Sequence, residues 1–269
     1  TPFGKDVEMH DTSFGWRFIN PKMKEMYGVD AMGETAENVA ERWGISREEQ
    51  DQFAYDSQLK WKQAHDAGKF KEEIVAYEIP KKKGESIIFD TDEQARLSTI
   101  ETLNNLKPAF KKDGSVTAGN SSSVNDGASA LAIASESFVR AHGLKPKARI
   151  IATAASGVEP AIMGIGPVEA VRKALKRAGL GIEDIGLFEL NEAFASQSIA
   201  CIRELGIDIN KVNVNGGAIA IGHPLGCSGA RISSTLIHEM QKRTDVKYGI
   251  ATMCVGVGQG MAIVYENIL

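Results

Sequence analysis

The sequence predicts an α/β fold in which a sheet is covered by helices on both faces. From residue 115 onward, strand-like and helix-like segments follow one another in the order β-α-β-α-β-α-β-β. Several strand-like segments are short, continuous apolar runs, which is typical of strands buried between two layers of helices. Such alternation favours a layered α/β domain. Ligands of such sheets bind in the loops at the carboxyl ends of the strands, so functional residues are expected there.

The region before this alternation, residues 1–112, is expected to form helices and irregular segments packed on the larger domain. Ser46-Arg47-Glu48-Glu49 is a capping box, in which the serine hydroxyl and the glutamate carboxylate each accept a bond from a free backbone N–H. It predicts a helix that runs to Ala67 and stops at Gly68. Shorter elements are expected at 35–43 (helix) and at 74–79 and 86–89 (strands).

The segments after residue 115 can be placed from their turn residues and periodicity. A small-residue loop at 119–123 leads into an alanine-rich stretch at 126–141, which predicts a helix. Residues 148–155 predict a strand buried on both faces. Pro167 is suited to the first turn of a helix that ends at Gly179, and its apolar residues recur with a helical period. The remaining strands are expected at 185–190, 211–214, 248–255 and 260–265, and the remaining helices at 193–205 and 229–243.

Composition excludes several classes of protein. The chain has 269 residues, 43% of them hydrophobic, and a net charge of −4, which does not favour a nucleic-acid partner. The basic cluster at 81–83, with further lysines at 107, 111 and 112, is interpreted as a solvated face. No apolar run reaches the roughly 18 residues of a membrane span. We therefore expect no membrane partner. A cytoplasmic location is expected from the cysteine content.

The chain has 3 cysteines, Cys201, Cys227 and Cys254, without close pairing. This pattern argues against a disulfide framework and fits a reducing compartment. Cys227 lies four positions after His223, but the C-x-x-C and H-E-x-x-H spacings of zinc sites are absent. No metal site is expected.

Three segments carry chemically notable residues at expected loop positions. Asn191 stands where a strand turns directly into a helix, so it is either a functional amide or a simple helix cap. His223 follows a glycine-rich run at 215–222, whose backbone must come very close to something; the histidine is a candidate base or a structural side chain. Cys254 ends an apolar strand before a glycine turn, so it is a candidate catalytic thiol or a small buried hydrophobe.

Together these segments resemble the thiolase family, and the resemblance covers essentially the whole chain. The runs that carry it are 15–21, 34–40, Thr117-Ala118-Gly119-Asn120, Asn191-Glu192-Ala193-Phe194, Gly222-His223-Pro224 and Cys254-Val255-Gly256. The resemblance implies a layered αβαβα architecture. It assigns 148–269 to a complete C-terminal half, 113–147 to the last part of an N-terminal half, and 1–112 to a loop domain. The family's nucleophilic cysteine is expected upstream of Thr1, because none of the three cysteines matches its motif, and this chain alone is expected to be inactive.

The resemblance also implies roles for individual residues in a Claisen condensation of CoA thioesters, or its reverse. His223 is expected to deprotonate the nucleophilic cysteine and to help form an oxyanion hole, which Asn191 completes by holding a water. Cys254 is expected to move the proton at the acetyl carbon, and the Gly256 N–H to serve a second oxyanion hole. Further positions are expected to meet coenzyme A: Ala118, Ser122 and Met163 along its pantetheine arm, and Arg96 at its nucleotide end. Coenzyme A is then a substrate, no resident cofactor is needed, and a homodimer or homotetramer is expected.

Within the family, the runs 15–21, 27–30 and 253–260 are most similar to the 3-oxoadipyl-CoA thiolases of aromatic catabolism. Many thiolases have a histidine where this chain has Ala31, which weakens an assignment as an acetoacetyl-CoA thiolase. A general 3-ketoacyl-CoA thiolase of β-oxidation remains an alternative. A non-catalytic CoA-binding relative and a Cys–His hydrolase that uses Cys254 as nucleophile are alternatives of other classes.

Overall fold

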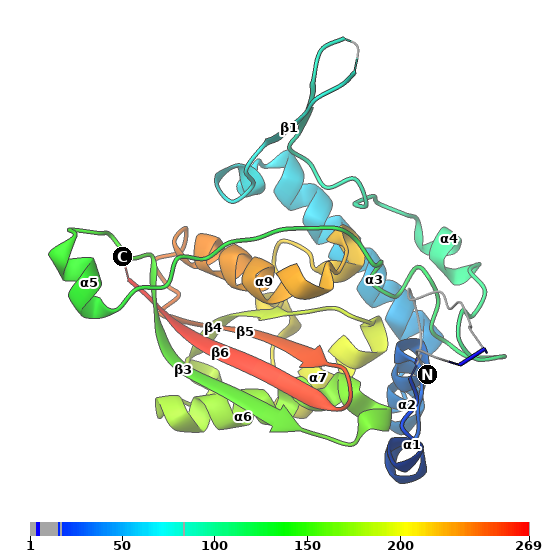
Figure 1. Cartoon of the computed structure of the whole chain (residues 1–269). Helices are drawn as coiled ribbons and strands as arrows, with labels where there is room; N and C mark the ends of the chain where they lie inside the picture. The colour runs from blue at the N-terminus through cyan, green and yellow to red at the C-terminus, as the bar shows by residue number, and fades with distance from the viewer. Residues whose placement is uncertain (1–3, 6–15, 17, 83, 269) are drawn as a thin grey trace.

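A computed structural model describes residues 4–5, 16, 18–82 and 84–268. Gly15 and Arg17 of the motif at 15–21, and Lys83 of the basic cluster, lie outside these residues. Within the described part, the main sheet has the strand order β3-β6-β5-β4 (Figure 1). Its strands are β3 (Ala148–Gly157), β4 (Ile185–Leu190), β5 (Tyr248–Val255) and β6 (Gln259–Asn267). No helix among the described residues is long and apolar enough to span a bilayer.

The sheet is mixed. β4 and β5 are parallel, while β6 runs antiparallel to both β5 and β3. The predicted strand at 211–214 is largely wrong, because only Val212 forms a bridge, parallel to Phe188. Asn213 explains this difference: it has a positive φ of 43°, and its side chain bonds Leu190 N and Leu190 O at 2.9 and 2.8 Å. An amide side chain thus replaces the next backbone pair of the ladder.

Helices cover both faces of this sheet, as the sequence predicted. α6 (Gly166–Ala178) and α7 (Ala195–Leu205) lie on one side, and α9 (Leu225–Met240) lies on the other (Figure 1). The predicted buried face of α6 is confirmed, and Gly179 ends the helix in the left-handed conformation. The core on the α6 side includes Val171, Phe188, Ile250 and Val264, and that on the α9 side includes Leu236, Met240 and Tyr265.

Strand β3 differs from its prediction in burial. It lies at the edge of the sheet, and beyond Ile151 its residues alternate between buried and more exposed positions. Ala152 and Ala154 face the core, while Thr153 and Ala155 are exposed. Alanine suits either environment, so an alanine-rich run could not indicate which face is covered.

The elements before residue 115 match their predictions closely. The capping box is present, with Glu49 N donating to Ser46 Oγ at 3.2 Å and Ser46 N donating to Glu49 Oε2 at 3.0 Å. It opens α3 (Arg47–Asp66), and the predicted stop at Gly68 has a left-handed φ of 68°. The remaining elements in this part are α1 (Pro21–Tyr27), α2 (Met32–Arg42), the 3-10 helix η1 (Lys69–Glu72), the hairpin strands β1 (Tyr77–Ile79) and β2 (Ile87–Phe89), and α4 (Ile100–Asn104).

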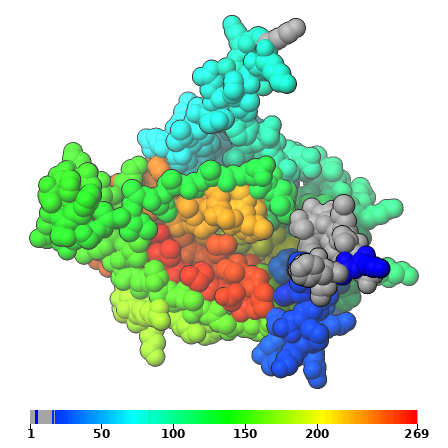
Figure 2. All heavy atoms as spheres, viewed as in Figure 1, coloured from blue at the N-terminus to red at the C-terminus, as the bar shows by residue number. Residues whose placement is uncertain are grey.

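The predicted helix at 126–141 is wrong over most of its length. Only α5 (Glu136–Ala141) is helical, and residues 122–134 cross the outer side of α9 without regular structure (Figures 1 and 2). A Cβ on Gly127 would lie 2.6 Å from Pro224, so this segment is pressed against the start of α9. This contact overrides the helix propensity of the alanines, as tertiary packing commonly does. The short elements of the second half are η2 (Pro160–Ile165), η3 (Ile182–Asp184), η4 (Ile209–Lys211) and α8 (Ala218–Ile221).

Two glycines allow α6 to begin in direct contact with β6. A Cβ on Gly260 would lie 2.1 Å from Gly166 O, and one on Gly166 would lie 2.3 Å from Gln259 O. Both obstacles are backbone atoms, which cannot rotate away. The start of α6 therefore depends on the absence of side chains at both positions.

We predict that Gly260→Ala lowers the free energy of unfolding by about 1–3 kcal/mol, because overpacking forces the backbone apart. Gly229→Ala is the matched control. A Cβ there would approach only Met253 Sδ, at 3.7 Å, and alanine favours the helix. Urea unfolding followed by circular dichroism measures both variants. Equal stability of Gly260→Ala and the parent protein would contradict this account of the contact.

Candidate active site

His223 lies in the short connection between α8 and α9. The residue before it, Gly222, occupies a position that only glycine fits. Gly222 has a φ of +95°, and a Cβ there would lie 2.1 Å from Asn125 Oδ1. The His223 backbone N–H donates to Ser123 O at 2.9 Å. These contacts join the histidine to the small-residue loop at 119–123, which is distant in the sequence.

The hydrogen bonds of the imidazole fix its tautomer. Nδ1 lies 2.6 Å from Ser228 Oγ, and that hydroxyl donates to Pro224 O at 3.1 Å. Because its one proton is used there, the serine oxygen accepts from Nδ1–H. Nε2 lies 3.3 Å from Asn191 Nδ2, which can only donate. His223 therefore carries its proton on Nδ1, and the lone pair on Nε2 accepts from Asn191 Nδ2.

The surroundings of His223 also disfavour its charged form. Burial, together with the positive charge of Arg231, lowers the pKa of the imidazole to about 4. At neutral pH the side chain is an uncharged acceptor. An uncharged imidazole is the protonation state from which a base can take a proton.

Asn191 lies at the end of β4, where its backbone N–H donates to Thr252 O at 3.0 Å. It does not cap the next helix, because α7 begins at Ala195 with Phe194 in the cap position. The side chain is 0% exposed, and its Oδ1 has no hydrogen-bond partner among the described residues. A fully buried acceptor without a donor is rare and indicates a place for a water or a ligand group.

Cys254 lies near the end of β5, the strand paired with β4, and is 4% exposed. Burial raises the pKa of its thiol to about 12, so it is protonated at neutral pH. It packs against Met163, Ala193 and Phe194. Two residues further on, Gly256 opens the turn to β6, and a Cβ there would meet no heavy atom within 4 Å.

A cavity of about 440 Å³ lies between α3, α4 with the chain around it, the small-residue loop and α8, and none of His223, Asn191, Cys254 and Gly256 lines it. Two of the predicted coenzyme A contacts, Arg96 and Ala118, line it, together with Ser121 and Ser123. Two others do not line it: Ser122 donates its hydroxyl to Ala193 O at 3.0 Å, and Met163 packs beside Cys254. Among the residues that the structure describes, no cluster of histidine, cysteine or acidic side chains could hold a metal ion.

Glu192 is a residue of this region that the sequence analysis did not single out. Its buried carboxylate accepts from Ser57 Oγ at 2.7 Å, Asn213 Nδ2 at 2.7 Å and Ile219 N at 3.1 Å. A Cβ on Gly217 would lie 2.3 Å from this carboxyl group. The glycine run was expected to mark a close approach, and here it approaches the protein's own acid. Ser228 was also missed, although its place one turn into the helix after His223 was a usable signal.

Comparison with known proteins identifies the family. A model of the thiolase N-terminal domain matches residues 6–137, and one of the thiolase C-terminal domain matches residues 144–267. The chain is 52% identical to a beta-ketoadipyl-CoA thiolase of Acinetobacter baylyi over 269 residues, covering 99% of this chain and 67% of the relative. The chain belongs to the thiolase family.

Other thiolases and solved structures agree with this assignment. A 3-oxoadipyl-CoA/3-oxo-5,6-dehydrosuberyl-CoA thiolase of Escherichia coli is also 52% identical, over 99% of this chain and 67% of that relative. The crystal structure of the Bacillus anthracis acetyl-CoA acetyltransferase superposes with a TM-score of 0.89 at 43% identity, covering 99% of this chain and 66% of that one. The predicted family and thiolase-like fold are therefore confirmed, and the chain spans about two thirds of the length of these thiolases.

We predict that His223 of this thiolase titrates with a midpoint near pH 4 and holds its proton on Nδ1 above that pH. An unperturbed histidine titrates near 6.5. Nitrogen-15 NMR of the imidazole measures both properties, with His223→Asn used to assign the signal. Ser228→Ala should leave the chain folded but mix the two tautomers. A midpoint at or above 6.5, or a proton on Nε2, would show that the described environment is wrong.

Proposed function

We propose that this chain carries the base, the proton carrier and one wall of the substrate cavity of a thiolase that cleaves 3-oxoacyl-CoA, or forms it in reverse. The observation that carries the proposal is the uncharged His223, whose Nε2 lone pair lies 3.3 Å from the buried amide of Asn191. A base beside an amide with an unused acceptor is an arrangement suited to thioester chemistry, in which a thiol is deprotonated and an oxyanion is then stabilised.

In the cleavage direction, His223 takes the proton of a nucleophilic cysteine at Nε2, and the thiolate attacks the 3-oxo carbon. The C2–C3 bond then breaks and its electron pair moves to C2, conjugated with the thioester carbonyl. Cys254 protonates C2, which releases acetyl-CoA. The thiol of coenzyme A next gives its proton to the Cys254 thiolate and attacks the acyl-cysteine. The acyl–cysteine bond breaks, the cysteine thiolate takes back the proton from His223, and the shortened acyl-CoA leaves.

The state of Cys254 supports its role as proton donor. A thiol with a pKa of about 12 holds its proton at neutral pH, so it can protonate a carbanion but is a poor nucleophile. Burial also raises the pKa of Cys201 and of Cys227. We therefore assign the nucleophile to none of these three cysteines. This also disfavours a hydrolase that uses Cys254 for attack.

Two oxyanion holes are proposed to stabilise the developing negative charge. His223, once protonated on Nε2, donates to the thioester oxygen, and Asn191 helps through a water that its unpartnered Oδ1 can hold. The Gly256 N–H serves the acyl-enzyme. Each preorganised donor in such a site contributes roughly 3–4 kcal/mol to the transition state.

Coenzyme A is proposed to enter the 440 Å³ cavity as a substrate, with no resident cofactor. Ala118 is suited to the narrow pantetheine arm, and the Arg96 guanidinium to the phosphates of the nucleotide. Ser122 and Met163 are proposed to support this channel indirectly. Ser122 bonds the Ala193 carbonyl, and Met163 packs against Cys254. The three free cysteines fit a cytoplasmic enzyme.

We also propose that the enzyme assembles as a homodimer or homotetramer. The hairpin formed by β1 and β2 projects from the body of the chain (Figure 1) and carries exposed apolar residues on strands only three residues long. A two-stranded hairpin of this size is marginal in water unless something packs on it. Contact between copies would supply that packing.

The division of roles predicts different losses for two variants of the complete protein. Cys254→Ser should slow carbon–carbon bond formation by about 10²–10⁴-fold while acyl transfer from acetyl-CoA to the enzyme persists, because only bond formation needs a proton removed from the acetyl carbon. His223→Asn should reduce both half-reactions. Cys227→Ser, the same change outside the site, is the control. Stopped-flow assays of condensation and of acyl-enzyme formation from acetyl-CoA separate the steps.

Equal loss of both half-reactions in Cys254→Ser would overturn this division. Acetyl transfer to coenzyme A by the 269-residue chain on its own would instead show that one of its three cysteines is the nucleophile.

For the substrate, we propose 3-oxoadipyl-CoA, on the basis of the names of the 52% identical relatives. Its terminal carboxylate needs a polar or cationic partner that a long alkyl chain would leave unpaired. We therefore expect kcat/KM for 3-oxoadipyl-CoA to exceed that for a long-chain 3-ketoacyl-CoA by at least about tenfold. Competition assays with both substrates measure the ratio. A ratio at or below one would favour the general 3-ketoacyl-CoA thiolase.

A further inference from the structure

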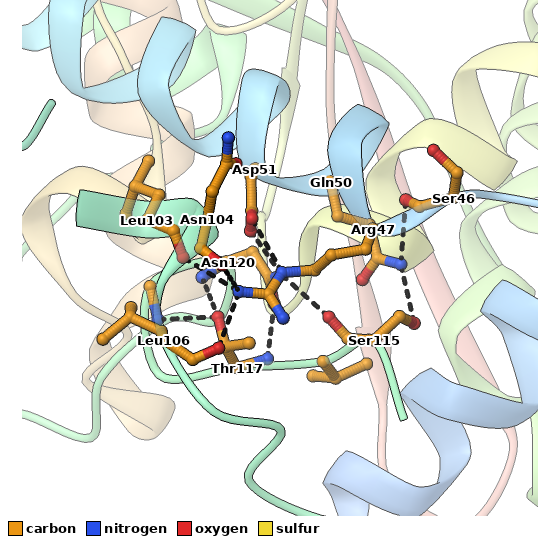
Figure 3. Close-up of polar contacts among 12 residues, drawn as sticks. Ser46, Arg47, Gln50, Asp51, Leu103, Asn104, Leu106, Ser115, Thr117 and Asn120 are labelled. Atoms are coloured by element: carbon orange, nitrogen blue, oxygen red, sulfur yellow. Dashed lines mark hydrogen bonds and ion pairs between the residues drawn. The ribbon is translucent and has the colours of Figure 1, made fainter. Parts of the chain in front are cut away.

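Asp51, on α3, is fully buried and divides its two carboxylate oxygens between two parts of the chain. Oδ2 accepts from Arg47 Nε at 2.7 Å, one turn earlier on the same helix. Oδ1 accepts from Nδ2 of Asn120, a residue of the small-residue loop, at 2.9 Å (Figure 3). A buried carboxyl group with this pair of donors is a fixed point, because movement of either partner leaves a buried oxygen without its donor.

Arg47 extends this fixed point to the end of α4. Its guanidinium donates to Leu103 O and Leu106 O, both at 2.8 Å, and to Asn104 O at 3.4 Å (Figure 3). These carbonyl groups lie at and after the end of a helix of five residues, where backbone acceptors lack helical partners. One arginine thus fixes the chain that follows α4.

Asn120 extends the fixed point to the small-residue loop. Its Oδ1 accepts from Thr117 N at 2.8 Å, and its Nδ2 also donates to Ser115 O at 3.1 Å. A Cβ on Gly119 would lie 2.5 Å from Leu106, so the loop also packs tightly against the chain after α4. The single amide closes the loop on itself and ties it to α3.

This loop leads directly to the base. The backbone O of Asn120 accepts from Ala195 N at 2.9 Å, and three residues later Ser123 O accepts from His223 N at 2.9 Å. Leu103, Leu106, Ala118 and Gly119, which the network holds, line the 440 Å³ cavity. The contacts of the Asp51 carboxylate therefore support both the cavity wall and the loop that binds the backbone of His223. Asp51 itself does not line the cavity.

We propose that Asp51, with Arg47 and Asn120, is a positioning residue: it fixes the loop that sets the width of the cavity and the place of His223. The proposal rests on the proposed function for its catalytic readout, although its effect on His223 can be observed without catalysis. If the network served stability alone, its loss would lower the unfolding temperature and change nothing else in the folded protein.

The decisive experiment exchanges the acid and the amide in the complete protein. Asp51→Asn leaves too few acceptors for Arg47 and Asn120, and Asn120→Asp places two carboxylates together. We expect each single change to weaken coenzyme A binding about tenfold, which is the effect of losing about 1.4 kcal/mol. We expect kcat to fall about 10- to 100-fold, because a displaced base reacts poorly. The double variant restores the acid–amide and Arg47 contacts but loses the bond from Asn120 to Ser115 O, and should recover part of both losses.

Three readouts are needed, all below the unfolding temperature of each variant: Kd for coenzyme A by calorimetry, kcat and KM for thiolysis, and the NMR signal of His223. Asp66→Asn is the matched control, since Asp66 pairs with Lys62 on the same helix at the same spacing but in an exposed position. Asp66→Asn should leave Kd, kcat and KM within twofold of the parent values and the NMR signal of His223 unchanged. If Asp51→Asn folds poorly, Arg47→Lys keeps the charge and removes the bonds to Leu103 O and Leu106 O.

The outcomes separate the two proposals. Lower unfolding temperatures with unchanged coenzyme A affinity, kinetics and His223 signal would overturn the positioning role. A failed rescue in the double variant would do the same. If the parent protein neither bound coenzyme A nor performed thiolysis, the proposed function would be wrong, and a shifted His223 signal in Asp51→Asn that returned in the double variant would still support positioning.

Discussion

The buried carboxylate of Glu192 is the constraint on which the arrangement of the site depends. It is 2% exposed and accepts three hydrogen bonds, one each from α3, the Asn213 turn and the start of α8. A carboxyl group in such a place is tolerated only when donors replace its water, and leaving one buried partner unsatisfied costs about 1–3 kcal/mol. The three segments are therefore held at one point, immediately beside Asn191.

The glycine run follows from this constraint. Gly217 leaves room for the Glu192 carboxylate, and Gly216, with a φ of +83°, leaves room for the backbone of α3, since a Cβ there would lie 2.7 Å from Ser57 O. α8 can then begin close to the acid, and its short length delivers His223 to the amide of Asn191. Close packing within the chain therefore brings His223 and Asn191 together, and no ligand is needed to order them.

Sequence reasoning succeeded where structure is decided locally. The capping box at Ser46 and the periodic face of α6 need only neighbouring residues, and both are present. The helix predicted at 126–141 was wrong over most of its length, because contact with Pro224 overrides the helix propensity of alanine. The burial predicted for β3 was wrong because alanine occurs on both covered and exposed faces. The motifs did indicate His223 and Asn191 as a pair. The Ser123 carbonyl and the Glu192 contacts could not be foreseen, because they join segments far apart in the sequence.

The electrostatics of the site connect this packing to its chemistry. Arg231, whose charge acts on His223, lies 3.6 Å from the buried Glu189, whose pKa burial raises to about 8. The same arginine and the same burial keep His223 uncharged, while Cys254 remains a thiol. The resting site thus holds a neutral base and a neutral acid. Charge arises only as a proton moves to the imidazole and an oxyanion forms, and the protein's fixed donors act at that moment. A low-dielectric site makes those donors stronger than they are in water, because no solvent must reorganise around the new charge.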